Sequence, residues 1–326
     1  MSNKIIKKKI MKTVIQLFLF VLISSGIYAQ QNSLLNHYIF NQTTINPAYV
    51  GTKQWTNINF TAASQWTGLK GAPLTQVLSL EGPISSKNGL GVQIINDKIG
   101  AQYQQSIYGS FSHILKLNEK WNLSFGIAAG LSYFTLDGTK LNTEDYDPSV
   151  PQQRVNTFKF DPKTGVFLYS DRFYAGFSVN DLLGDLITNK KINSIDQARH
   201  YYLTAGYVFD LGDQFKLKPS FLIREDLKAQ STLDINNFVL YKETFWLGVT
   251  YRFGVNSVFN NELDNTLRMR NALVLMTEWN INKSLIVGYA FTMSTSALSG
   301  FSGHEIEIAY TFPKKADTRM RTPRYF

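Results

Sequence analysis

The chain has 326 residues, of which 17% are charged, 14% are aromatic and none is cysteine. This composition excludes a natively unfolded protein, which needs few aromatic residues and a high net charge. The lack of cysteine excludes disulfides, thiolate metal ligands and cysteine nucleophiles. The mean hydropathy of −0.14 is far below that of helical membrane proteins. It agrees with a β-barrel, in which apolar outward residues alternate with polar inward ones.

The formal net charge of +9 is concentrated in two terminal segments. Residues 1–29 contain five lysines and no acidic residue, and residues 313–326 contain five basic residues and one aspartate. The part of the chain between them is neutral. The basic charge therefore does not indicate a nucleic-acid-binding face.

Residues 1–29 have the pattern of a signal peptide. Lysines precede the apolar run from Val14 to Ile23, and a small-residue cleavage site ends at Ala29. The apolar run is too short to cross a bilayer as a helix, although a retained N-terminal anchor is the alternative. Met11 is an alternative start, because the segment that follows it is an ordinary signal peptide by itself. We expect the mature protein to leave the cytoplasm.

Alternation of apolar and small or polar residues is the main signal in the rest of the chain. Leu123, Phe125 and Ile127 alternate with Ser124 and Gly126 in a run of eleven residues, longer than a usual soluble strand of about 5–6. We expect the three apolar side chains to face lipid. Fourteen such segments occur, at approximately 55–64, 74–81, 89–96, 101–114, 121–135, 158–169, 172–179, 200–210, 215–224, 232–240, 244–253, 272–280, 285–293 and 304–312.

These segments predict an all-β fold, a transmembrane outer-membrane β-barrel of about 14 antiparallel strands. An even strand number allows closure, which removes exposed edges. Long connections at about 136–157, 180–199 and 254–271 alternate with short ones. Because such barrels have short periplasmic turns and long external loops, we predict that both termini are periplasmic. A soluble periplasmic protein of several sheets is the alternative, but it does not explain this asymmetry.

We therefore divide the chain into a signal peptide at 1–29, a plug-like periplasmic lead-in at 30–54, a transmembrane barrel at 55–312 and a basic periplasmic tail at 313–326. The lead-in is expected to be non-helical and to plug or rim the barrel. Pro47 forces Asn46 toward extended geometry, and Gly51 permits a turn. Pro313 stops the last strand, because proline lacks a backbone donor.

No motif predicts catalysis, a cofactor or a metal site. The histidines show no metal-ligand spacing, and no nucleophile elbow, phosphate loop or carboxylate pair is evident. We predict a protein that is not an enzyme, with no catalytic residue and no cofactor. A polar lumen accounts for the charged residues at inward positions, with a selective pore as the alternative. These residues are Lys216, Lys218, Arg224, Arg252, Glu278, Glu305 and Glu307.

The tail is a candidate partner-binding segment. Basic side chains can make charge-assisted contacts to acidic groups, and aromatic residues can anchor in an apolar groove. A solvated tail near lipid head groups is the alternative. The candidate residues are Arg319, Arg321, Arg324, Tyr325 and Phe326.

Short motifs of Asn, Pro, Gly and Trp residues form an ordered series along the chain. The positions are Asn46, Pro47, Ala48, Gly51, Gln65, Trp66, Gly71, Ala72, Pro73, Asp97, His304 and Glu305. Their order resembles the PorP/SprF family of type IX secretion system outer-membrane proteins from Bacteroidetes, over about residues 30–312. We expect these positions to be structural.

The resemblance implies a non-enzymatic outer-membrane component of type IX secretion. Such a protein would bind and help export or display an adhesin-like cargo with a type B C-terminal domain, linked in gliding bacteria to motility. Its expected partners are outer-membrane lipid, the cargo and other secretion components, including periplasmic ring or peptidoglycan-linked proteins, but no nucleic acid. A diffusion porin or small-molecule transporter of similar architecture is the alternative.

Overall fold

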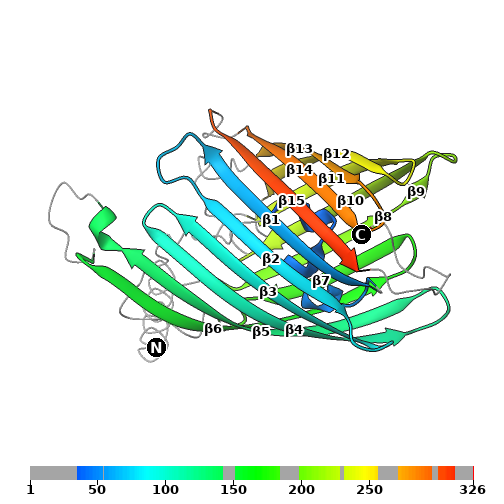
Figure 1. Ribbon diagram of the computed structural model, residues 1–326, viewed down its shortest axis with the longest axis horizontal. Coiled ribbons are helices and arrows are strands. Elements are labelled where there is room, and N and C mark those ends of the chain that lie inside the picture. The colour runs from blue at the N-terminus through cyan, green and yellow to red at the C-terminus, as the bar shows by residue number, and fades with distance from the viewer. Residues whose placement is uncertain are drawn as a thin grey trace, which may run out of the picture.

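The computed structural model describes residues 35–53, 55–141, 151–183, 198–227, 231–255, 271–295, 300–312 and 326. They form one antiparallel sheet that closes into a barrel, with short 3-10 turns inside it (Figure 1). None of the helical turns in these ranges is long and apolar enough to cross a bilayer. The strands are β1 (Thr56–Thr67), β2 (Leu74–Pro83), β3 (Asn88–Ile99), β4 (Gln102–Lys116), β5 (Asn122–Asp137), β6 (Arg154–Tyr169), β7 (Phe173–Asn180), β8 (His200–Tyr207), β9 (Phe209–Asp210), β10 (Phe215–Glu225), β11 (Ser231–Tyr241), β12 (Phe245–Val255), β13 (Ala272–Asn280), β14 (Leu285–Ser294) and β15 (Ser302–Phe312).

The barrel closes through the pairing of its first and last strands. β1 pairs with both β2 and β15, and Thr56 lies opposite Phe312. β8 and β9 both pair with β10 and are separated only by Val208, so they act as one strand of the wall. The barrel therefore has 14 antiparallel strand positions, which confirms the fold predicted from the sequence.

The strands have an outer apolar face; their inner face is polar or small on β5 but carries buried apolar side chains such as Phe238, Trp246 and Met276 on β11, β12 and β13. In β5, Phe125 is 45% exposed and Ile127 is 62% exposed, whereas the alternate residues Ser124 and Gly126 are buried. Successive side chains of a strand point to opposite faces. One face of the wall contacts lipid and the other faces the filled lumen, so exposed apolar residues alternate with buried residues. The seven charged residues expected at inward positions are buried or half-buried, which agrees with a polar lumen.

The connections at the two ends of the barrel differ in length. We call one end the short-turn end, where β2, β4, β6, β9, β11 and β13 are followed by turns at 84–87, 117–121, 170–172, 211–214, 242–244 and 281–284. The opposite, long-loop end carries the connections after β5, β7 and β12, most of which lie outside the described residues. β1 begins and β15 ends at the short-turn end.

Two strands extend beyond the rest of the wall at the long-loop end (Figure 1). β5 and β6 each have 16 residues, whereas a membrane strand needs only about 9–11. β6 begins at Arg154, before the position expected from the sequence, and pairs there with Asp137. Part of the connection expected at 136–157 is therefore paired sheet.

A plugged barrel lumen as the candidate functional site

Residues 35–53 lie inside the barrel, and we call this segment the plug. It contains the turns η1 (Asn36–Ile39), η2 (Gln42–Thr44) and η3 (Pro47–Tyr49). Asparagine side chains cap two of them, since Asn41 accepts a hydrogen bond from Thr43 N at 3.2 Å and Asn46 accepts one from Ala48 N at 2.9 Å. Asparagine favours such local bonds over a continuous helix.

The Asn46-Pro47-Ala48 motif packs against glycines of the wall. Asn46 Nδ2 donates to Val166 O in β6 at 3.0 Å. A Cβ added to Gly126 would lie 2.2 Å from Ala48 N, and one added to Gly165 would lie 2.2 Å from Asn46 Oδ1. The plug can approach the wall this closely only where the wall has no side chain.

Gly51 allows the plug to turn toward β1. Its φ is +74°, and its backbone N–H donates to Glu81 Oε2 at 2.8 Å. A Cβ at this position would lie 2.5 Å from Gly89 Cα. Both the positive φ and the close approach of two backbones require glycine here.

Buried charged side chains hold the beginning of the plug. Glu305, which is 2% exposed, accepts hydrogen bonds from Asn36 N at 2.7 Å and His37 N at 2.9 Å. Its Oε1 also lies 2.7 Å from His37 Nδ1. Arg252 donates to Asn36 Oδ1 at 3.2 Å and forms two hydrogen bonds with Asp234. Each buried charge in this group therefore has hydrogen-bond or ion-pair partners, because an unpaired charge in the low-dielectric interior is costly.

His37 lies between two carboxylates. Its Nδ1 contacts Glu305, and its Nε2 lies 3.7 Å from Glu307 Oε2. Burial lowers the pKa of His37, but the negative charges of Glu307 and Glu305 outweigh it and raise this pKa to about 9. The imidazole is therefore protonated at neutral pH and forms an ion pair with the wall.

The motif residues near Trp66 build the connection between β1 and β2 at the long-loop end. Gln65 N donates a hydrogen bond to Pro73 O at 3.0 Å, and Ala72 N donates one to Leu69 O at 3.1 Å within the connection. Trp66 has φ +50° and Gly71 has φ +81°. These residues lie apart from the plug and shape a hairpin.

The remaining candidate residues are separated from one another. Thr75 Oγ1 donates to Asp97 Oδ1 at 2.5 Å, on neighbouring strands. The His304 ring lies beside Tyr289, with 2.7 Å between Nδ1 and the tyrosine hydroxyl, and does not share the contacts of Glu305 with the plug. In the tail, the Phe326 ring is buried inside the barrel. The candidate tail residues Arg319, Arg321, Arg324 and Tyr325 lie outside the described part of the chain.

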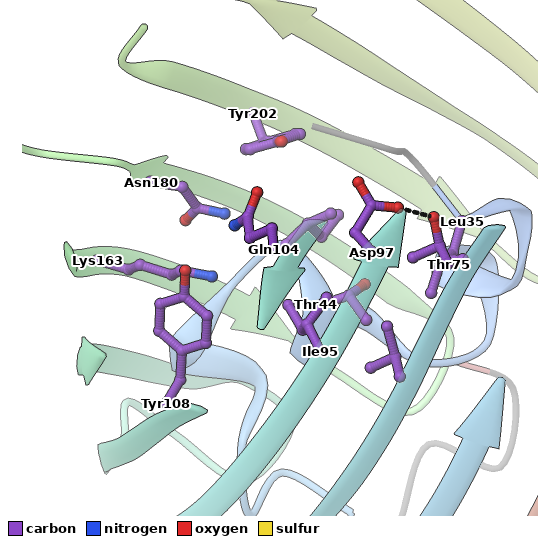
Figure 2. Close-up of a pocket in the computed structure, with 12 residues that line it drawn as sticks. Leu35, Thr44, Thr75, Ile95, Asp97, Gln104, Tyr108, Lys163, Asn180 and Tyr202 are labelled. Carbon is purple, nitrogen blue, oxygen red and sulfur yellow. Dashed lines mark hydrogen bonds between the residues drawn. The ribbon is translucent and has the colours of Figure 1, made fainter. Parts of the chain in front are cut away.

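A cavity of about 630 Å³, which includes the solvent at its opening, lies on the long-loop side of the plug (Figure 2). Plug residue Ile45 contributes to its apolar base. Its walls carry Asp97, Gln104, Lys163 and Tyr202, from four different strands. A few polar groups around an apolar base are typical of a binding pocket.

The described residues contain no group of three or more His, Asp or Glu side chains that could hold a metal ion. His200 and Asp181, both buried, form a pair with 3.2 Å between Nδ1 and Oδ2. Asp181 directly follows β7 and His200 begins β8, so the pair joins the two ends of the β7–β8 connection through the Nδ1 side of the ring.

The sequence predictions missed the small wall residues that receive the plug. Ser124, Gly126, Ala128, Gly130 and Ser132 form the inner face of β5. Such a run of small inward residues indicates that another segment packs closely against the strand. Tyr108 fills the space over Gly130, and the plug fills the space over Gly126.

The sequence matches the family described as type IX secretion system membrane protein PorP/SprF over residues 27–312. No curated protein matches it. Similar solved structures include the CymD monoaromatic hydrocarbon channel, with 12% identity, a TM-score of 0.50, and 90% of this chain and 98% of that chain covered. The Acinetobacter baumannii outer membrane protein Omp33 has 11% identity and a TM-score of 0.44, with 80% of this chain and 100% of that chain covered.

The identities to the solved structures are too low to compare more than the fold, and that fold is an outer-membrane barrel. The family match covers the plug and the whole barrel wall. Its range also includes every motif position on which the resemblance was based. The protein is thus a non-enzymatic outer-membrane β-barrel, and the chain belongs to the PorP/SprF family of type IX secretion system membrane proteins.

Proposed function

We propose that this protein holds a secreted, adhesin-like cargo with a type B C-terminal domain at the cell surface and helps its export or display. The cavity on the long-loop side of the plug carries this proposal (Figure 2). It offers Asp97, Gln104 and Lys163 as polar contacts and Ile45 as an apolar contact. The membership in a type IX secretion family supports a protein ligand.

The proposal includes an orientation in which the long-loop end faces outward and both termini are periplasmic. Outer-membrane barrels have short periplasmic turns and long external loops, and the short turns lie at the end where β1 begins and β15 ends. A cargo that has crossed the membrane would then reach the cavity from outside. The loops around the cavity would enlarge the contact toward the roughly 800 Å² per partner of an ordinary interface.

Other secretion components would contact the opposite end. We assign to the short-turn end and the basic side chains of the tail, Arg319, Arg321 and Arg324 among them, the contact with periplasmic ring or peptidoglycan-linked proteins. The concentration of five basic residues in this tail supports electrostatic attraction to acidic surfaces. In a gliding bacterium, the displayed cargo would include adhesins of the motility apparatus.

Filling the cavity tests the cargo proposal. Gln104→Trp introduces a large side chain into the cavity from β4, whereas Leu115→Trp places the same side chain on the outer face of that strand. Tagged variants are purified from native membranes, and bound proteins are quantified by mass spectrometry. We expect Gln104→Trp to reduce cargo recovery at least about tenfold, equivalent to ~1.4 kcal/mol of binding free energy, while Leu115→Trp retains it.

The outcomes separate cargo binding from a pore. Equal cargo recovery by the two variants would exclude the cavity as the binding site. Steady ion conductance of the intact protein in planar bilayers, together with no bound secreted protein, would favour the porin function instead. Loss of heat-modifiable migration in gels would show that a variant has not folded, and Gln104→Leu would then replace Gln104→Trp.

A further inference from the structure

A buried lysine at the short-turn end of the lumen is surrounded by aromatic rings. Lys218 in β10 is fully buried, and its Nζ donates to Ile39 O of the plug at 2.8 Å. The same Nζ lies 4.8 Å from the ring centroid of Phe40 and 5.6 Å from that of Trp246. It lies 5.9 Å from the ring centroid of Tyr174. These distances allow cation–π attraction, which strengthens when water is excluded.

Phe326 completes this group. Its side chain is 3% exposed, its ring centroid lies 4.8 Å from that of Tyr174, and Lys218 Nζ lies 5.8 Å from it. It also belongs to a buried cluster that includes Phe167 and Val208. The Phe326 ring thus packs against residues of the wall. It lies near Lys218, which also donates a hydrogen bond to the plug.

We propose that this aromatic–lysine pocket is a binding site for an aromatic side chain, and that Phe326 of the same chain is its occupant. The pocket is formed by Lys218, Tyr174, Phe167 and Val208. By binding Phe326, it fastens the end of the tail to the lumen at the short-turn end. The contact is an intramolecular latch, in addition to the hydrogen bonds that hold the plug.

The position of the pocket fits this occupant. Tyr174 is near the start of β7, beside a turn of the short-turn end. Phe312, where β15 ends, lies at the same end. Removal of a phenylalanine ring from water contributes a factor of at least about ten in favour of the docked state, which opposes the entropy lost when the tail is held.

Thiol labelling tests the latch, because the chain has no cysteine of its own. Val208→Cys places a small thiol in the buried cluster that contains Phe326, and Ala290→Cys places one in a separate buried cluster of the lumen. Each is combined with Phe326, Phe326→Ala or Phe326→Trp in the full chain. A water-soluble maleimide then reports how often each thiol is exposed.

We expect Phe326→Ala to accelerate labelling at position 208 at least about tenfold and to leave the rate at position 290 unchanged. Phe326→Trp retains an aromatic ring and should keep the slow rate at position 208. Equal rates with Phe326 and Phe326→Ala would overturn the latch. Equal acceleration at both positions would also overturn it, because that result indicates general loosening of the lumen.

A crosslinking measurement keeps the test valid if Val208→Cys does not fold. Phe326 is replaced by the photoreactive residue benzoylphenylalanine, which retains an aromatic side chain. Illumination should join this residue to peptides of β7 or β10 in the same chain, as identified by mass spectrometry. Crosslinks only to other proteins or to lipid would overturn the proposal.

Discussion

The outer and inner faces of the barrel wall place different requirements on the residues at each position, although these residues alternate along the same strands. Phe125 and Gly126 are neighbours in β5, but the first faces outward and the second contacts the plug. Any apolar side chain of suitable size satisfies lipid at an outer position. At an inner position, the residue must fit one particular neighbour, such as Ala48 N of the plug beside Gly126 or the Tyr108 ring beside Gly130.

This difference separates two kinds of sequence constraint. The outer face requires only a chemical class, and its residues leave a regular pattern. The inner face requires partners that are distant in sequence, such as Glu305 and His37. Substitutions on the inner face should therefore disturb plug docking, and substitutions on the outer face should disturb the stability of the wall in lipid.

The largest expected effect is the loss of Glu305, an inner residue. Glu305→Ala removes the acceptor of the Asn36 and His37 backbone N–H groups and leaves His37 with one fewer counter-charge. Breaking a buried ion pair costs about 3–5 kcal/mol. Hydrogen exchange of the plug backbone should show this loss as a lower local opening free energy. Ile306→Ala, at the adjacent outer residue, should change the opening free energy of the plug by about 0.5 kcal/mol or less. Equal changes in the two variants would show that inner and outer residues do not differ in their effect on the plug.

The second prediction concerns an outer residue. Phe125→Arg places a charge on the lipid-facing side of β5. If this position lies near the bilayer midplane, the free energy of unfolding should fall by about 2–4 kcal/mol. Unfolding by denaturant in lipid vesicles measures this change. Phe125→Leu is the apolar control, and a similar loss in both variants would show that ring packing, not contact with lipid, determines the stability.

The sequence was sufficient to predict the outer face and therefore the barrel. Alternation located every strand of the wall, because lipid imposes the same requirement on all of them. It was not sufficient for the inner face. The motif residues Asn46 and Gly51 were identified, but their partners Gly165 and Gly89 were not. A glycine in a strand indicates a close approach without identifying the approaching segment.

The third prediction concerns a wall glycine. Gly126→Val would bring a side chain into the backbone of Ala48, whereas a Cβ on the outer residue Gly109 meets no atom within 4 Å. Overpacking costs about 1–3 kcal/mol, so Gly126→Val should displace the plug from its site while the wall remains closed. Planar bilayers should then record larger ion conductance for Gly126→Val and no change for Gly109→Val. Equal conductance of the two variants would show that the plug does not depend on this contact.

The fourth prediction concerns the pH dependence of plug docking through His37. Its pKa rises from 6.5 in a free chain to about 9 in the docked plug, because the carboxylates of Glu307 and Glu305 outweigh the effect of burial. Since the docked form has the higher pKa, protonation stabilises docking. This stabilisation is fully present below pH 6.5 and is lost as the pH rises through about 9. Conductance in planar bilayers should therefore increase between these values. His37→Gln cannot be protonated and should remove the step, whereas an unchanged step in this variant would assign the titration to another group.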